Sequence, residues 1–333
     1  MKHSKTVVLV LSTVLLMILL SSCLAIEDAK QKAQETWAVL DVDYNGKVIT
    51  DLRYGEAERN LYDLYLPEDT SKATNPKVEH LILFIHGGSW TSGSKEDGAR
   101  YCRNFSDHGY VSASISYTLK DDGIDISILM INDEVKAAVQ SIKDKCSELG
   151  IELKDMAVSG FSAGACQAMM YGFKEAKTSA LEVKFILQQS GPTTFDPEIW
   201  NSDAVHWTIK RQAGLDGTTK GDANWISLFS GQKVTETMVQ NGEAEPIWRS
   251  ISPFSYITDD SIPILSAYGV YDSVVPPESR NVLEQALEAA GQIRGTDFDT
   301  IVMEHSGHML AGDVDKQRLY LQKVYEYCDQ YFE

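Results

Sequence analysis

Short apolar runs alternate with amphipathic segments over most of the chain. Six runs have the length and composition of buried strands, at 80–85, 111–117, 156–159, 185–189, 264–268 and 298–303. The segments between them repeat apolar residues every three or four positions, most clearly from Ile131 to Leu149, where Gly150 ends the pattern. Strands that alternate with helices predict an α/β fold, with a mostly parallel central sheet and helices on both faces.

The N-terminal part of the domain has a different pattern. Strand-like runs at 47–54 and 60–66 flank a polar turn at 55–59, which predicts an antiparallel hairpin. Residues 41–48 resemble the first half of a calcium loop, with oxygen ligands at alternate positions. Because the twelfth position is Leu52 and not a carboxylate, an Asn-Gly hairpin at 45–46 is favoured over a calcium site.

Residues 192–261 interrupt the alternation of strands and helices. They contain four of the six tryptophans, namely Trp200, Trp207, Trp225 and Trp248. A structureless connection of this length is uncommon inside a compact domain, so we predict an inserted cap with structure of its own. We expect most of these tryptophans to have a structural role.

The first 22 residues have the features of an export signal. A basic start at 1–5 precedes an apolar run at 7–20, which is shorter than the roughly 20 residues that span a bilayer. Residues 20–23 (Leu-Ser-Ser-Cys) resemble the lipobox of bacterial lipoproteins. This resemblance implies lipidation of Cys23, with acyl chains such as palmitate, and is favoured over an ordinary signal peptide with an incidental cysteine. We therefore predict an exported protein anchored at a bacterial cell envelope, with a polar stalk at 23–43 and the folded domain at 44–333.

Composition narrows the function classes. The chain of 333 residues is 43% hydrophobic and 23% charged, which is typical of a folded globular protein. A net charge of −18 argues against a nucleic-acid partner, because such binding depends on clustered Lys and Arg. The remaining cysteines lack metal-ligand spacing and identify no disulfide; Cys166 is interpreted as a small buried side chain.

Residues 160–164 (Gly-Phe-Ser-Ala-Gly) fit the G-x-S-x-G motif of a nucleophile elbow, centred on Ser162. The motif follows a predicted strand and opens a predicted helix, as an elbow requires. Small residues are needed because strand and helix cross closely at this turn. Such a motif also arises by chance, as a helix start with glycine turns, so the surrounding motifs decide its meaning.

A glycine-rich loop follows the strand at 80–85. It reads His86-Gly87-Gly88-Ser89-Trp90, and glycine lets the backbone approach a substrate closely. In a hydrolase of this type, the N–H groups of Gly87 or Gly88 together with that of Ala163 would form an oxyanion hole. His86 stands at a strand end, so we interpret it as a brace for the loop and not as a catalytic group.

An acid and a base follow in the order that the elbow requires. Asp272 lies in a loop after the strand at 264–268, and two histidines, His305 and His308, follow the strand at 298–303. His308 is the better candidate base, because His305 lies nearer the strand. Ser162, Asp272 and His308 would then form a catalytic triad.

Together these motifs resemble the α/β-hydrolase esterase and lipase superfamily, in particular esterases with an H-G-G-x-W oxyanion loop that act on acetyl or feruloyl groups of carbohydrates. Residues 61–67 (LYDLYLP) and 93–95 (GSK) add to this resemblance, which runs from about residue 60 to the C-terminus. The chain departs from the pattern at Ala165 and Cys166, where the family often has Gly-His, and its Trp-rich insertion is longer than usual.

The resemblance implies a serine hydrolase that cleaves carboxylic esters through an acyl-enzyme and requires no metal or organic cofactor. Its substrate would be a small-molecule or polysaccharide ester carrying an acetyl or aromatic acyl group. Two alternatives remain open: an amidase or peptidase with the same triad, such as an arylformamidase, and a non-catalytic surface protein that uses the fold for binding. The oligomeric state is left open.

The lipobox at 20–23 makes a prediction about location. Cys23→Ser should move the protein from the membrane fraction to the soluble fraction, or block its processing, because the acylated side chain is lost. Fractionation with immunoblotting measures this. Unchanged membrane partition with normal cleavage would show that the anchor does not depend on Cys23.

Overall fold

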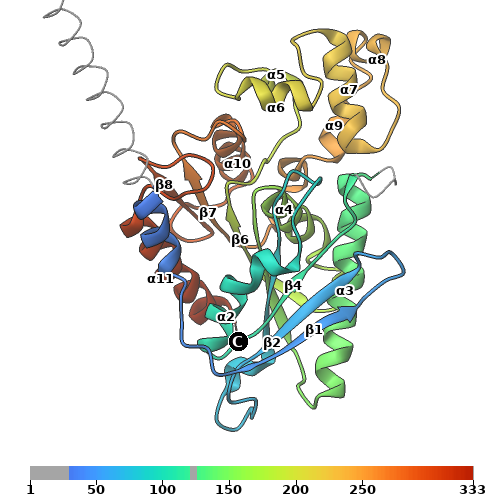
Figure 1. The fold of residues 1–333 in the computed structure, drawn as a ribbon. Helices are drawn as coiled ribbons and strands as arrows, with labels where there is room; N and C mark the ends of the chain where they lie inside the picture. The colour runs from blue at the N-terminus through green and yellow to red at the C-terminus, as the bar shows by residue number, and fades with distance from the viewer. Residues whose placement is uncertain (1–29, 121–125, 333) are drawn as a thin grey trace, which may run out of the picture.

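The computed structural model describes residues 30–120 and 126–332; the predicted signal at 1–22 and Cys23 lie outside this range. An eight-stranded sheet runs through the domain in the order β1-β2-β4-β3-β5-β6-β7-β8 (Figure 1). The strands are β1 (Lys47–Arg53), β2 (Leu61–Leu66), β3 (His80–Ile85), β4 (Val111–Ile115), β5 (Asp155–Phe161), β6 (Glu182–Gln189), β7 (Ile264–Gly269) and β8 (Phe298–Met303).

Strand pairing matches the predicted fold class. Strand β2 pairs antiparallel with β1 and with β4, while every other neighbouring pair in this sheet is parallel. All six apolar runs form strands, and the N-terminal hairpin is β1 and β2. The prediction of a mostly parallel α/β fold is therefore confirmed.

The two faces of the sheet are covered by different helices. Alternate residues of β3 show the division: Leu81 and Leu83 pack into one apolar cluster, whereas Ile82 and Phe84 pack into the other. The first cluster includes side chains of α3 (Ile128–Glu148), α4 (Ala163–Glu175) and α10 (Glu278–Ala289). The second includes side chains of α2 (Ala99–Asp107) and α11 (Val314–Tyr331). Two short 3-10 helices, η1 (Pro76–Glu79) and η2 (Lys95–Gly98), lie in the connections.

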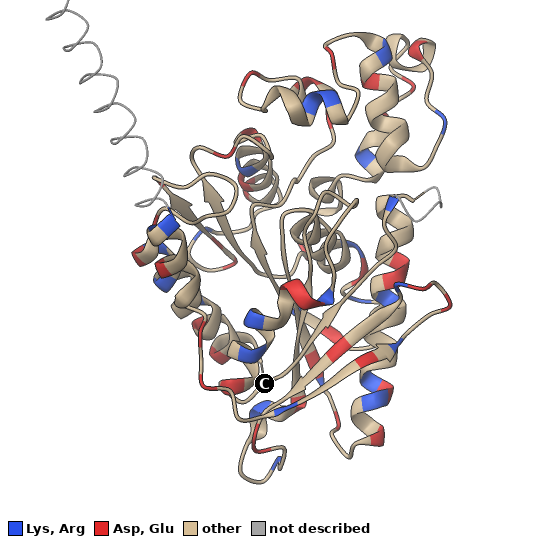
Figure 2. Ribbon diagram, viewed as in Figure 1, with Lys and Arg blue, Asp and Glu red and all other residues tan. Residues whose placement is uncertain are grey.

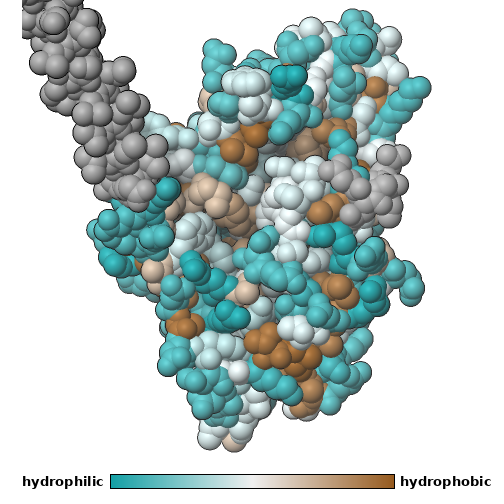
Figure 3. Space-filling view, in the orientation of Figure 1, coloured by the Kyte–Doolittle hydropathy of each residue, from teal (hydrophilic) through white to brown (hydrophobic). Residues whose placement is uncertain are grey.

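A helical cap stands between β6 and β7, at the top of the molecule in Figure 1. Its elements are α5 (Pro197–Trp200), α6 (Trp207–Gln212), α7 (Thr219–Ser230), α8 (Glu236–Gln240), α9 (Glu245–Ser250) and the 3-10 helix η4 (Pro253–Tyr256). The cap is tied to the body by a backbone hydrogen bond of 2.8 Å, which the N–H of His206 donates to the carbonyl of Ser273. Apolar side chains gather where the cap meets the body (Figure 3).

The predicted stalk at 23–43 is described from residue 30 onward, and this part packs on the domain. Residues 30–38 are helical, and Thr36 and Leu40 are buried. Trp37 contacts the rings of Tyr101 and Phe161 with centroid distances of 6.3 and 6.4 Å. The segment packs on the domain because these apolar side chains lose more water-exposed surface there than they would in an extended stalk.

The prediction of an Asn-Gly hairpin at 45–46 is wrong. Residues 41–45 form no strand, and β1 begins only at Lys47. Tyr44 instead folds back, and its hydroxyl donates hydrogen bonds to the carbonyls of Lys47 and Leu66. Within residues 30–120 and 126–332, no three His, Cys, Asp or Glu side chains gather into a group that could hold a metal ion.

Two further properties concern the described residues as a whole. None of their helices combines the length and apolar character that crossing a bilayer requires. Cys102, Cys146, Cys166 and Cys328 are buried free thiols, and burial raises the pKa of Cys166 well above its usual range. The prediction that Cys166 is a small buried side chain is therefore confirmed.

The docked N-terminal segment predicts a stability effect. Leu40→Ala should lower the free energy of unfolding by about 2–5 kcal/mol, because it leaves a cavity at a site that is 1% exposed. Urea unfolding of the two proteins measures the difference. Gln34 is an exposed residue of the helix at 30–38. Gln34→Ala therefore serves as control and should change stability by less than about 0.5 kcal/mol. Equal stabilities for Leu40→Ala and the parent protein would contradict the packing described here.

Candidate active site

Ser162 sits on a strained turn between β5 and α4. Its backbone has φ 55° and ψ −122°, a conformation that few residues other than glycine adopt. A Cβ at Gly160 would collide with the carbonyl of Gly164, and one at Gly164 would collide with the carbonyl of Ile85. The two glycines therefore let strand and helix cross closely, and the sharp turn presents the hydroxyl of Ser162 at the carboxyl edge of the sheet.

The structure brings together the three residues predicted as a triad. His308 Nε2 lies 2.8 Å from Ser162 Oγ, and His308 Nδ1 lies 2.8 Å from Asp272 Oδ2. Asp272 and Ser162 are buried, and the side chain of His308 is 13% exposed. One imidazole thus bridges a hydroxyl and a carboxylate, which is the arrangement that lets a base accept the serine proton.

Backbone groups hold the acid in place. The second oxygen of Asp272, Oδ1, accepts hydrogen bonds from the N–H groups of Val274 and Val275, both at 2.9 Å. Its two oxygens are thereby committed to different partners, one to the loop and one to His308. This fixes the carboxylate orientation and leaves Oδ2 to hold the imidazole.

The loop that carries His308 is fixed at two points. Ser190, directly after β6, donates a hydrogen bond of 2.9 Å to the carbonyl of His308. Asp313 accepts from the hydroxyl of Ser306 at 2.6 Å and from the backbone and ring of His305. Burial alone would raise the pKa of Asp313, but the hydrogen bonds from Ser306 and His305 outweigh it and lower that pKa.

His305 occupies a different position from His308. Its side chain is 76% exposed, and its Nδ1 lies 2.8 Å from Asp313 Oδ1. The ring therefore braces the loop from outside, away from Ser162. Of the two histidines that the sequence offers, the structure brings only His308 to the serine.

The predicted oxyanion loop lies against the elbow. A Cβ at Gly87 would stand only 3.1 Å from the Cβ of Ser162. The loop can therefore lie this close to the serine because residue 87 has no side chain. Gly88, Ser89 and Trp90 all have positive φ angles, and the carbonyl of Gly88 accepts two backbone hydrogen bonds of 3.0 Å. Among the described residues, the N–H groups of Gly87, Gly88 and Ala163 have no hydrogen-bond partner, as donors reserved for a substrate would require.

His86 braces this loop from beneath. It is fully buried, its ring stacks on Tyr117 at 4.2 Å, and its Nδ1–H donates to the carbonyl of Gly87 at 2.6 Å. The Tyr117 hydroxyl donates to the carbonyl of His86 at 3.1 Å. Burial lowers the pKa of His86 to about 4, so the ring is neutral at pH 7.

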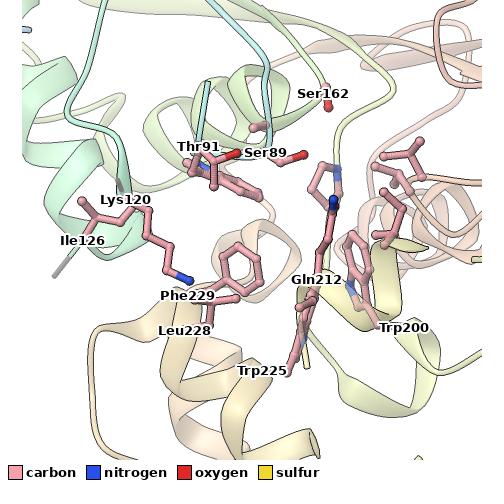
Figure 4. A pocket seen from close by; sticks show the side chains of 17 residues that line it. Ser89, Thr91, Lys120, Ile126, Ser162, Trp200, Gln212, Trp225, Leu228 and Phe229 are labelled. Carbon is pink, nitrogen blue, oxygen red and sulfur yellow. The ribbon is translucent and has the colours of Figure 1, made fainter. Parts of the chain in front are cut away.

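A cavity of about 370 Å³ opens over Ser162 and extends under the cap (Figure 4). Its walls come from the carboxyl ends of β3 to β7 and from α5, α6 and α7, where ligands of open parallel sheets usually bind. The lining residues are Ser89, Trp90, Thr91, Lys120, Ile126, Ser162, Ala163, Pro192, Trp200, Ile209, Gln212, Ala213, Trp225, Leu228, Phe229, Val274 and Val275.

The cap tryptophans divide into two kinds. Trp200 and Trp225 line the cavity, and each also donates its indole N–H to a backbone carbonyl of the segment that follows β6. Trp207, which is 62% exposed, and the half-buried Trp248 do not line this cavity. Trp225 contacts Trp200 and Phe229, both at 4.5 Å between ring centroids, so the cavity wall is part of a packed aromatic cluster.

Several residues of the site escaped the sequence analysis. Trp90 is the last residue of the glycine-rich loop motif, and the motif alone predicts no further contact for it. Its ring lies 5.1 Å from that of Phe229 between centroids, so it joins the oxyanion loop to the cap. Lys120 lines the cavity although no motif surrounds it. The roles of Ser190 and Asp313 depend on contacts between distant segments, which no local pattern reports.

Comparison with known proteins places this geometry in a family. A family model named BD-FAE matches residues 62–287, about two thirds of the chain, and this span includes Ser162 and Asp272 but ends before His308. The chain belongs to the BD-FAE family.

Several curated proteins are similar to parts of this chain. Esterase LipC of Mycobacterium tuberculosis is 23% identical over 240 residues, covering 72% of this chain and 55% of that protein. Kynurenine formamidase of Danio rerio is 29% identical over 124 residues, covering 37% of this chain and 38% of that protein. The chain thus spans about half or less of the length of these curated relatives.

Similarity among solved structures concerns the fold. An inhibited esterase B from Lactobacillus rhamnosis superposes with a TM-score of 0.65 at 15% sequence identity, over 95% of this chain and 97% of that chain. BD-FAE membership and this shared architecture identify the domain as an α/β-hydrolase fold.

The buried ring of His86 predicts an acid-sensitive stability. Its pKa in the folded chain, about 4, lies below the usual value of 6.5, so the unfolded chain binds more protons between these two pH values. The resulting stability is present above pH 6.5 and is lost as the pH falls toward 4. Between pH 7 and pH 5 the parent protein should therefore lose about 2 kcal/mol more than His86→Gln, as measured by urea unfolding.

A matched control uses the exposed histidine of the base loop. His305→Gln should lose as much stability between pH 7 and pH 5 as the parent protein does. If His86→Gln also shows the full loss, then another group causes the acid sensitivity.

Proposed function

We propose that this BD-FAE member is a serine esterase in which Ser162 is the nucleophile, His308 the base and Asp272 the acid that orients it. The observation that carries the proposal is the line of two 2.8 Å contacts from Ser162 Oγ through the His308 ring to Asp272. A strained serine, a bridging imidazole and an oriented carboxylate in one cavity are the parts that a nucleophilic acyl-transfer site needs.

The reaction follows from these positions. His308 Nε2 accepts the proton of Ser162 as Oγ attacks the acyl carbon, and Asp272 stabilises the imidazolium and holds its tautomer. N–H groups from Gly87 or Gly88 and from Ala163 donate to the oxyanion of the tetrahedral intermediate. His308 then protonates the leaving alcohol. Water, activated by the same base, hydrolyses the acyl-enzyme and restores Ser162.

The substrate we propose is an acetyl or aromatic acyl ester, carried by a polysaccharide or a smaller sugar. Family membership supports an acetyl or feruloyl group. A cavity of 370 Å³ with walls from Trp90, Trp200 and Trp225 has room for an aromatic acyl group or a sugar ring, and both stack favourably on indole.

We further propose that the enzyme acts outside the cytoplasm, held at the envelope membrane by a lipid on Cys23. The lipobox-like residues 20–23 support this location. An extended substrate such as a polysaccharide does not enter the cytoplasm intact, so an external location suits the proposed substrate.

An amidase of the formamidase type is the second candidate. The match to the Danio rerio formamidase supports it, and the same triad cleaves amides. A panel separates the two candidates: p-nitrophenyl esters of increasing acyl length, acetylated xylan, feruloylated xylan and an aryl formamide. Faster turnover of the formamide than of every ester would favour the amidase. If a fluorophosphonate probe fails to label Ser162, the protein is a non-catalytic binder.

The proposed roles predict the kinetics of four variants. Ser162→Ala and His308→Ala should each lower kcat by about 10⁶-fold, because a triad acts as a unit. Asp272→Asn should cost about 10⁴-fold, since it spoils the tautomer while nucleophile and base remain. His305→Ala, the matched control, should cost about tenfold or less, since it removes one hydrogen bond worth about 0.5–1.5 kcal/mol.

Circular dichroism of each variant separates loss of chemistry from loss of fold. An inactive His305→Ala together with an active His308→Ala would overturn the base assignment.

A further inference from the structure

The cavity over Ser162 contains one feature that ester hydrolysis alone does not explain. Most of its lining is apolar or aromatic, yet Lys120 contributes a positive charge. Among the described residues that line this cavity there is no Asp or Glu to neutralise it. Lys120 is an exposed residue, so its ammonium group is hydrated and accessible to an anionic ligand that enters the cavity.

The position of Lys120 is fixed by the body of the protein. Its backbone N–H donates to the carbonyl of Trp90 at 2.9 Å, which attaches the end of the β4 connection to the oxyanion loop. Figure 4 shows its side chain extending across the cavity toward Leu228 and Phe229, away from the wall that carries Ser162. The ammonium group is thus placed to meet a part of the substrate that lies apart from the scissile bond.

Two other lysines of the body form ion pairs with carboxylates. Lys95 is buried and lies 2.9 Å from Asp63, and Lys136 lies 2.7 Å from Glu175. For Lys120 no ion pair occurs among the described residues. Within residues 30–120 and 126–332, the cation that lines this cavity is therefore not engaged in an ion pair.

The net charge of the whole chain affects how an anionic substrate would bind. With a net charge of −18, the protein repels anions at long range, and Figure 2 shows acidic residues spread over the cap and the body. A substrate with a carboxylate would be bound against this field unless a local cation offset it. Lys120 is placed to do so at the cavity.

We infer that Lys120 binds a carboxylate of the substrate, and that the preferred substrates are esters with an acidic group near the ester bond. This inference rests on the proposed esterase function and specifies its substrate class. The carboxylate has two possible sources: the acyl half, as in a hemiester of a dicarboxylic acid, or the alcohol half, as in an acylated uronic acid. Lys120 is a specificity residue in this scheme and takes no part in bond breaking.

The test compares charged and neutral esters of matched size in two arms. The acyl arm uses p-nitrophenyl hemiglutarate against p-nitrophenyl valerate. The alcohol arm uses the acetyl ester of methyl glucuronoside against that of methyl glucoside. In each arm the measured quantity is the ratio of kcat/KM for the charged ester to kcat/KM for the neutral one, in low and in high salt.

In at least one arm, Lys120→Ala should lower this ratio by about five- to tenfold, as loss of a partly exposed ion pair implies. Lys120→Glu should lower it further, and Lys120→Arg should keep most of it. The ratio of the parent enzyme should fall in high salt, whereas that of Lys120→Ala should not. Lys233→Ala, which removes an exposed cap charge outside this cavity, is the control and should leave the ratio unchanged.

The outcomes separate the inference from the function on which it rests. The arm that responds identifies the half of the substrate that carries the carboxylate. If the parent enzyme hydrolyses the neutral esters through Ser162 but the ratio does not respond to Lys120→Ala or Lys120→Glu in either arm, the inference is overturned and the esterase stands. If the parent enzyme cleaves no ester in either arm, the proposed function fails and the inference with it.

Discussion

The close crossing of β5 and α4 constrains everything around Ser162. At this crossing the carbonyls of Ile85 and Gly164 occupy the space that side chains at Gly164 and Gly160 would need, so the turn is possible only with glycine at both positions. The strained backbone of Ser162 persists because the N–H of Ser162 donates to the carbonyl of Gln189 at 2.8 Å and α4 begins directly after it. The hydroxyl takes its position from this turn, and the oxyanion loop packs against it at Gly87.

Much of the fold could be predicted because its strands are buried on both faces. Strands such as β3 and β7 are mostly apolar and buried throughout, and a run of that kind between turn residues has few other interpretations. The order of Ser162, Asp272 and His308 along the chain could also be predicted, because parallel strands place the loops after them at one edge of the sheet. Fold class and candidate triad therefore followed from local patterns combined with one topological rule.

What escaped prediction depends on contacts between distant segments. Residues 30–43 are mostly polar, and only the surface formed by Tyr101 and Phe161 gives Trp37 a place to pack. The spacing of His305 and His308 does not show which ring faces the serine, since that follows from loop bonds to Ser190 and Asp313. Density of tryptophan in the cap indicated a structured insertion, but it did not tell which rings would border the cavity.

The hydrogen bond between His206 and Ser273 has a consequence for the motion of the cap. Ser273 follows Asp272 directly, so the cap is hydrogen-bonded to the residue beside the triad acid. A movement that lifts the start of α6 from the body has to stretch or break this hydrogen bond beside the triad acid. The position of the cap and the orientation of the His308 ring are therefore linked through this hydrogen bond and Asp272. A ligand that contacts α6 in the cavity therefore also bears on the loop that orients the imidazole.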